Sequence, residues 1–126
     1  MRAISVTRFG SEDRPLYEVK ANLFKGLAHP VRVRVLEVLS ASPEVPVAEL
    51  LADTGLEASH LSLHLAVLRR HHLVTAERRG SQMFYRLAQP GVADLLTVAK
   101  GLLVRILDDT QRQLHSTVNL DDLGPA

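Results

Sequence analysis

The apolar positions of this chain repeat with two different periods, and the change of period separates its predicted elements. Spacings of three and four residues are typical of amphipathic helices, and they predict five helices, at about 15–28, 30–40, 48–52, 58–72 and from Pro90 onward. Strict alternation predicts a hairpin, with arms at 74–78 and 83–87 around turn residues 79–82. A very short strand is expected between Val45 and Val47.

The residues between these segments are typical of helix ends. Asp13 can cap a helix that opens near Pro15, and His29-Pro30 separates the first two helices, with His29 as a turn residue. Gly55 suits the left-handed position that ends the third helix. In the fourth helix the face expected to meet the core consists of Leu61, Leu65 and Leu68. A short helix, a tight turn, a second helix and a hairpin predict a mainly α fold with a small β-hairpin, the winged helix-turn-helix.

The length of 126 residues is that of one domain with short flanking segments. We expect an N-terminal arm at 1–14, the winged helix domain at 15–115 and an acidic tail at 116–126. Apolar residues make up 46% of the chain and aromatic residues only 4%, which favours helices that pack on helices. So small a core favours pairing with a second copy. With no long apolar run and no secretory leader pattern, we expect a cytoplasmic protein without a membrane partner.

The net charge is only +1, but the positive charges are concentrated on the fourth helix and the hairpin. Residues 56–90 contain two acidic side chains, Glu57 and Glu77, against five arginines: Arg69, Arg70, Arg78, Arg79 and Arg86. Arg69 and Arg70 close the helix, while Arg78 and Arg79 lie on the hairpin, so both pairs can reach phosphates beside a groove. This distribution favours double-stranded DNA as a partner.

The outward face of the fourth helix is expected to enter the major groove. With the leucine stripe inward, a rotation of about 100° per residue places Ser59, Ser62, Leu63 and Ala66 outward. His60 and Val67 lie at the edge of this face, and His64 lies nearer the core. Small side chains allow close approach to DNA, hydroxyls and imidazoles can hydrogen bond to bases, and Leu63 can contact a thymine methyl.

Three segments give the chain a resemblance to a known family: LAHPVRVRVLEVL (27–39), VAELLADTGL (47–56) and SLHLAVLRRHHLV (62–74). It resembles the ArsR/SmtB family of bacterial winged helix repressors over about residues 16–110. The resemblance implies a homodimer that binds an inverted-repeat operator, with helix 58–72 in the major groove and the wing 78–82 at flanking backbone or minor groove. The implied reading positions are Ser59, His60, Ser62, Leu63 and His64, and the wing positions are Arg78, Arg79, Ser81 and Gln82. The implied dimer interface uses the first and last helices, through Leu16, Val19, Leu23, Leu95, Leu102, Leu103, Ile106 and Leu107.

The chain departs from the family's metal-sensing pattern. Pro46, Val47 and Ala48 stand where the family has a cysteine metal box, and the chain has no cysteine. The last-helix site is also missing, because Asp94 is followed by Leu96 rather than histidine, with only His115 downstream. An unusual site from His71, His72, His115 and Asp108-Asp109 is left open, although adjacent helical histidines point about 100° apart. We therefore predict no metal and no cofactor.

Enzymatic activity is not expected, since the sequence has no cysteine nucleophile, no glycine-rich phosphate loop and no H-E-x-x-H motif. Two other functions stay open: a winged helix that binds proteins without specific DNA binding, and RNA binding. RNA binding is the weaker alternative, because only Phe84 and Tyr85 lie near the basic block and alternation buries at least one of them. A possible effector stays unidentified, and the sequence does not indicate the operator sequence or the role of residues 1–14.

Overall fold

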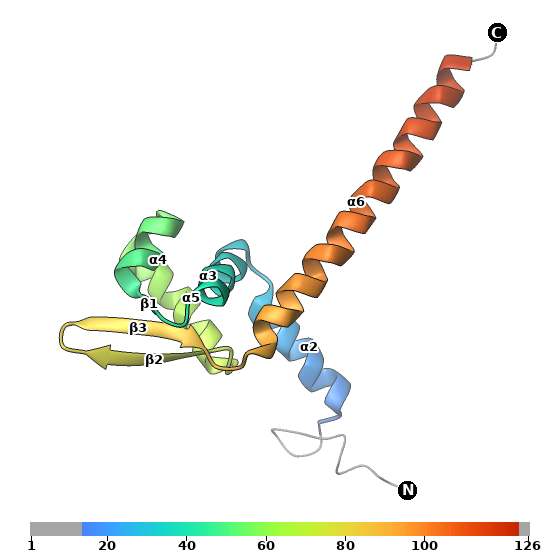
Figure 1. Ribbon diagram of the computed structural model, residues 1–126. Coiled ribbons are helices and arrows are strands. Elements are labelled where there is room, and N and C mark those ends of the chain that lie inside the picture. Colours follow the sequence, from blue (N-terminus) through green and yellow to red (C-terminus); the bar gives the residue numbers. More distant parts are fainter. Residues whose placement is uncertain (1–13, 124–126) are drawn as a thin grey trace, which may run out of the picture. The chain divides into compact units, whose positions relative to one another are not determined.

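The computed structural model describes residues 14–123 and, for side chains, residues 14–118 (Figure 1). The chain divides into two compact units, one ending at Val92 and the other beginning at Ala93. The elements follow the predicted order: α2 (Leu16–Leu27), α3 (Pro30–Ala41), β1 (Val45–Pro46), α4 (Val47–Thr54), α5 (Ala58–Arg70), β2 (Val74–Arg79), β3 (Gln82–Leu87) and α6 (Gly91–Leu123). The winged helix-turn-helix prediction is confirmed.

The three strands form one antiparallel sheet in the order β1-β3-β2. Val74 pairs with Leu87 at one end of the hairpin, and Arg79 pairs with Gln82 at the other. The short strand β1 joins the other side of β3, where Val45 pairs with Tyr85. Alternation buries Tyr85 and leaves Phe84 partly exposed, so at least one of the two aromatic residues is buried, as the sequence predicts. The sheet therefore contains one strand more than the hairpin alone.

The core of the first unit lies where α3, α5 and the sheet meet. The predicted stripe of α5 faces inward, with Leu61 and Leu68 at most 1% exposed. Burying each such leucine contributes roughly 1.5–3 kcal/mol to folding, so this stripe fixes the rotation of α5 about its axis. The rest of this core comes from α2, α3, α4, the strands and the start of α6: Leu27, Val35, Leu36, Leu39, Val45, Leu50, Leu73, Val74, Tyr85 and Val92.

Helix α5 is shorter than predicted because two backbone hydrogen bonds close it early. The Leu73 N–H donates to the Leu68 carbonyl and the His72 N–H to the Arg69 carbonyl, both at 2.9 Å. This pair of bonds defines a Schellman cap, which requires a left-handed residue. His72 takes that position with φ of 59°, where glycine is the usual residue. Residues 71 and 72 therefore belong to the turn before β2.

Helix α6, which makes up nearly all of the second unit, is longer than predicted. It continues to Leu123, through most of the segment 116–126 that the sequence indicates as a tail. The predicted cap at Asp13 and the arm 1–14 lie outside the described residues, except for Arg14. Many large apolar side chains of α6 are exposed: Val98, Leu102, Leu103, Val104, Ile106, Leu107, Leu114 and Val118. No helix within residues 14–123 is both long and apolar enough to cross a membrane.

Candidate nucleic-acid interface

A tight turn between α4 and α5 forms the helix-turn-helix. Gly55 adopts φ of 69°, and its N–H donates to the Leu51 carbonyl at 2.9 Å, which ends α4. The Thr54 hydroxyl donates to the Leu50 carbonyl at 2.8 Å, so the last turn of α4 is also tied by a side chain. Helix α5 then begins after Glu57, whose carbonyl accepts from the His60 and Leu61 N–H groups at 3.1 Å. Gly55 thus has the conformation that its predicted role requires.

A bidentate ion pair fixes α4 against α3. Arg34 Nε donates to Asp53 Oδ1 at 2.8 Å, and Arg34 Nη2 donates to Asp53 Oδ2 at 2.9 Å. The arginine lowers the pKa of Asp53, and the Asp53 carboxylate, with help from Glu37, raises the pKa of Arg34. The planar fork of arginine matches both carboxylate oxygens, so this contact sets orientation as well as distance.

The outward face of α5 is exposed and consists mainly of small side chains. Ser59, His60, Ser62 and Leu63 are all exposed, and Leu63 has 66% of its surface accessible. Because the leucine stripe lies on the opposite side, these four residues share the outward half of the helix. A face of this width, with few bulky groups, fits a groove that admits a helix.

His64 does not share the outward face. It is partly buried, and its Nδ1 lies 3.3 Å from Arg32 Nη1 of α3. Its ring packs on the ring of His29, with the two centroids 4.2 Å apart. Burial lowers the pKa of His64, and the nearby His29, Arg32 and His60 lower it further. The structure therefore places this predicted reading residue between α5 and α3.

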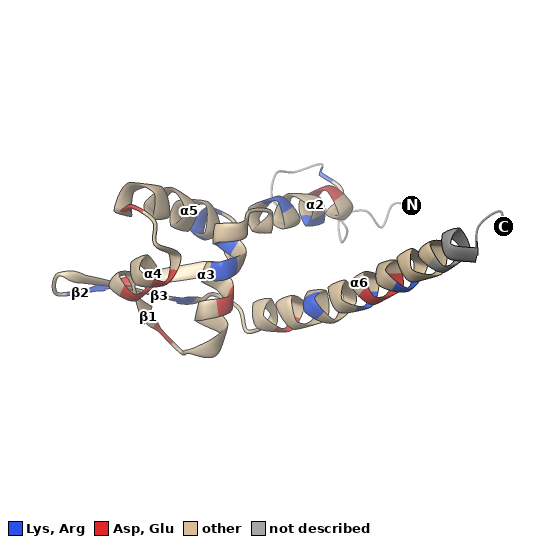
Figure 2. Cartoon of the chain, turned by 90° about the horizontal axis from the view of Figure 1, so that it is seen from above, with Lys and Arg blue, Asp and Glu red and all other residues tan. Residues whose placement is uncertain are grey.

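The C-terminal end of α5 presents two exposed arginines. Neither Arg69 nor Arg70 forms an ion pair with another described residue. Cations at a helix C-terminus are favoured by the helix dipole, so these charges suit their position without any acidic partner. The neighbouring His71 is partly buried, and burial, followed by the charge of Arg70, lowers its pKa. Figure 2 shows basic residues at this end of α5 and along β2.

The wing is a tight hairpin with a two-residue turn. Gly80 has φ of 63°, and among the described residues His72 is the only non-glycine with positive φ, so Ser81 has negative φ. Positive φ at the first central position alone is the pattern of a type II′ turn, which twists in the sense that antiparallel strands need. This turn exposes Ser81 and the flanking pair Arg79 and Gln82.

The two adjacent arginines of the wing have different surroundings. Arg79 pairs with Glu44 and with Glu77, the latter at 3.7 Å, and its guanidinium lies 4.0 Å from the centre of the Phe84 ring. The hydrogen bond to Glu44 raises the pKa of Arg79. Arg78 forms no ion pair within the described part of the chain. Sequence reasoning treated these arginines alike, but the structure makes Arg78 the more available cation.

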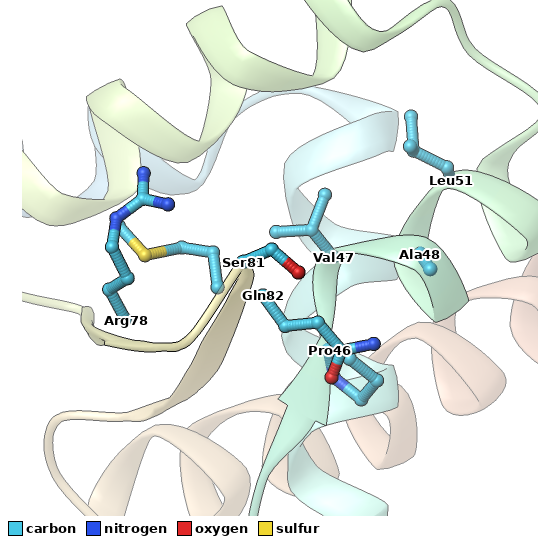
Figure 3. Close-up of a pocket in the computed structure, with 8 residues that line it drawn as sticks. Pro46, Val47, Ala48, Leu51, Arg78, Ser81 and Gln82 are labelled. Atoms are coloured by element: carbon cyan, nitrogen blue, oxygen red, sulfur yellow. The ribbon is translucent and has the colours of Figure 1, made fainter.

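A groove of about 330 Å³ separates the wing from the start of α4 (Figure 3). Pro46, Val47 and Ala48, the residues at the position of the missing cysteine box, line it. Arg78 and Gln82 lie on the wing side of the same groove (Figure 3). The groove offers apolar groups, one guanidinium, a hydroxyl and an amide, and its lining residues include no cysteine, histidine or carboxylate.

The side chains considered for an unusual metal site lie in separate parts of the chain. His71 and His72 follow α5, whereas Asp108 and His115 line a shallow hollow on α6. Asp109 pairs with Arg112 at 3.6 Å. Within the described residues no three histidine, cysteine, aspartate or glutamate side chains gather as a metal site would require.

Sequence reasoning missed Arg32, which connects three helices. The LAHPVR segment contributes to the family resemblance, but its pattern indicates no contact for this arginine. Arg32 Nε donates to the Gly26 carbonyl at 2.8 Å, and Nη2 donates to the Lys25 carbonyl at 3.3 Å. Its partner His64 lies 32 positions away, so no local pattern could reveal the contact.

Comparison with known proteins gives relatives of one kind, although no family model matches the chain. The HTH-type transcriptional regulator Rv0081 of Mycobacterium tuberculosis is 50% identical over 99 residues, which are 78% of this chain and 86% of that protein. The HTH-type transcriptional regulator YgaV of Escherichia coli is 34% identical over 68% of this chain and 86% of its own length.

Solved structures agree with these relatives. The crystal structure of Rv0081 superposes with a TM-score of 0.71 and covers 77% of this chain and 97% of that one. The repressor BigR of Xylella fastidiosa is 35% identical, with a TM-score of 0.63 over 68% of this chain and 87% of its own. Mb0332 of Mycobacterium bovis, described as a homodimeric winged helix-turn-helix DNA-binding domain of a possible ArsR-family regulator, is 29% identical, with a TM-score of 0.67 over 75% of this chain and 86% of its own.

Proposed function

Because the chain belongs to the ArsR family of winged helix-turn-helix transcriptional regulators, we propose that it is a repressor that binds an inverted-repeat operator as a homodimer. The observation that supports this most strongly is the position of its unpaired cations. Arg69 and Arg70 lie in the last turn of α5 and Arg78 lies on the wing, and none of them pairs with an acidic side chain of the described residues. Phosphates on both sides of a groove are the partners that such an arrangement fits.

Helix α5 is proposed to read bases in the major groove. Ser59, His60 and Ser62 supply hydrogen-bonding groups on the exposed face, and Leu63 supplies apolar contact. His64 is assigned a different role, since its Nδ1 is directed to Arg32. The proposal is therefore that His64 positions the helix rather than contacting bases.

The wing is proposed to contact flanking DNA through the tip of the hairpin. Arg78, Ser81 and Gln82 are exposed there and can reach backbone or minor groove. Arg79 contributes less to phosphate binding because Glu44 and Glu77 already balance its charge. Its stacking on Phe84 instead stiffens the wing.

The homodimer is proposed to use apolar residues of α2 and α6. Leu102 is 58% exposed and Leu107 57%, which is unusual for leucine on a helix of this length. In α2, Leu16, Val19 and Leu23 line a groove of about 510 Å³ together with residues at the end of α5. A second copy would remove both apolar surfaces from water. The proposed interface also includes Leu95, Leu103 and Ile106.

Selection from a pool of random duplexes at physiological salt tests the proposed function. Enrichment of an imperfect inverted repeat, with half-sites about one helical turn apart, is the expected result for a two-fold dimer. Weak, salt-sensitive binding without enrichment would contradict it and favour a protein-binding winged helix. Substitution of Ser62 by Ala should then change the base preferred at one position per half-site, while Thr97→Ala on α6 serves as the matched control.

A further inference from the structure

The junction of α2, α3 and α5 is held by one guanidinium and two imidazoles. Arg32 donates to the Gly26 and Lys25 carbonyls at the end of α2 and approaches His64 Nδ1 of α5. The ring of His29 lies against that of His64, with an angle of 40° between the ring planes. We call these residues the His29–His64–Arg32 cluster. It is the polar contact between the beginning of α3 and the middle of α5.

The hydrogen bonds of the cluster define the protonation of both histidines. His29 Nδ1 accepts from the Val31 N–H at 3.1 Å, which caps α3. Arg32 has only donors, so at 3.3 Å the His64 Nδ1 has to act as the acceptor. Both Nδ1 atoms therefore lack a proton, and both rings are neutral with their proton on Nε2.

The groups around the cluster disfavour added positive charge. From α3 and its cap, His64 faces His29 and Arg32, and from its own helix it is near His60. Helix α2 contributes backbone carbonyl groups, and these accept hydrogen bonds from Arg32 and not from His64. No aspartate or glutamate of the described residues pairs with any of these histidines. A proton on either ring would therefore have no acidic partner.

We propose that the His29–His64–Arg32 cluster makes DNA affinity sensitive to acid, because the polar contact between α5 and α3 forms only while both histidines are neutral. A proton on His64 Nδ1 would place its N–H group opposite an N–H group of Arg32, so that neither could accept a hydrogen bond. A proton on His29 Nδ1 would remove the acceptor that caps α3. Both changes loosen the helix that contacts DNA. The inference rests on the proposed role of α5 in reading DNA.

The expected effect follows from proton linkage. If His64 must be neutral in the binding form, the affinity falls as the pH drops through the pKa of His64 in the free protein. With the ordinary value of about 6.5 the loss between about pH 7.5 and about pH 5.5 would be about tenfold, and the lowered pKa of His64 makes the loss smaller over this range. This direction is opposite to that of histidines facing phosphates, which bind DNA more tightly when they are charged.

Substitution of both histidines distinguishes a DNA affinity that falls on acidification because of the cluster from one that changes through other histidines. Asparagine places an amide oxygen near the position of Nδ1 and does not titrate, and it also caps helices well. The affinity of the His29→Asn/His64→Asn double variant for the selected duplex should therefore fall less on acidification than that of the wild type, by a factor of up to about ten between about pH 7.5 and about pH 5.5. His72→Asn is the matched control, because His72 is exposed and asparagine tolerates its positive φ. It should retain the wild-type response, and parallel curves for wild type and double variant would overturn the proposal.

Nuclear magnetic resonance of the ¹⁵N-labelled imidazoles tests the cluster without DNA. The expected result is the Nε2–H tautomer for His29 and His64, with His64 titrating below about 6.5. An Nδ1–H tautomer at either residue would overturn the proposal at its base. If the wild type selects no duplex even at neutral pH, the proposed function fails, and the proposed effect of acid on DNA affinity fails with it. The tautomers of His29 and His64 would still show whether the cluster itself forms. Urea unfolding of each variant at both pH values verifies that folded protein is compared.

Discussion

Replacing Arg78 by alanine should weaken DNA binding by removing a phosphate contact, and the salt dependence of binding measures that loss directly. The guanidinium of Arg78 has no acidic partner in the described structure, so its whole charge is available to DNA. Each phosphate that a protein neutralises adds about 0.9 to the slope of log affinity against log salt concentration. A homodimer places two copies of Arg78 on one operator, so the slope should decrease by about 1.8.

The same arithmetic gives a change in affinity that can be measured. Between about 50 and about 200 mM salt, a slope difference of about 1.8 corresponds to a factor of about 12. The affinity advantage of the wild type over Arg78→Ala should therefore shrink about 12-fold over this range. Fluorescence anisotropy with the selected duplex and a scrambled duplex should give the same slope change, since phosphate contacts do not depend on sequence.

Arg79→Ala provides an internal comparison within the wing. Glu44 and Glu77 balance the charge of Arg79, so its removal should change the slope much less than the removal of Arg78. Arg112→Ala on α6, where Asp109 is the partner, should leave the slope unchanged. An unchanged slope for Arg78→Ala, or equal slopes for the two wing variants, would refute the assignment of the phosphate contact.

Four further changes test the packing and the assembly. Gly26→Ala should destabilise the fold by about 1–3 kcal/mol in urea unfolding, because the new methyl would lie 2.6 Å from His71 Cγ; unchanged stability would show that this ring moves freely. His72→Gly should stabilise the protein by about 0.5–1 kcal/mol, since glycine adopts the left-handed cap without strain, and a loss of stability would contradict the Schellman assignment. Leu102→Asp should weaken self-association at least about 30-fold in sedimentation velocity, whereas a dimer as tight as that of the wild type would exclude this face of α6. Because burial lowers the pKa of His64 and His71, the unfolded chain takes up protons before the folded protein does as the pH falls below about 6.5. The free energy of unfolding should therefore be highest above that pH and decrease on acidification. A flat profile of unfolding free energy against pH would be inconsistent with the lowered pKa values.

The order of elements could be predicted from sequence because local signals, the hydrophobic pattern together with proline and glycine at the boundaries, determine it. The spacing of Leu61, Leu65 and Leu68 predicts which side of α5 is buried, and all three are buried. Gly55 marks the turn for a local reason, since a left-handed residue ends α4. The change from a helical period to alternation locates the wing within one residue of its strands.

The details of the candidate interface depend on contacts between distant residues, which a pattern does not contain. Glu44 reaches Arg79 across 35 positions, and this pairing decides which wing arginine is available. Rotation about the helix axis places His64 nearer the core than His60, but only the structure shows the Arg32 contact that directs His64 Nδ1 away from the outward face. The last helix differs for another reason: the sequence predicts a long helix from Pro90 followed by an acidic tail from residue 116, whereas α6 continues through most of that segment to Leu123.

Both edges of the three-stranded sheet are built so that strands of other molecules cannot extend it. At one edge, β1 has only two residues, and Pro46 has no N–H to donate to an approaching strand. At the other edge, β2 ends in the charged run Glu77, Arg78 and Arg79, which would lose hydration if another strand covered it. A wing that stands out from the domain is otherwise a risk for aggregation at the concentrations of a crowded cell. Because neither edge favours pairing with another strand, contacts between copies of the protein rely on side chains of the helices. The hairpin then stays available to a partner that does not bind as a strand.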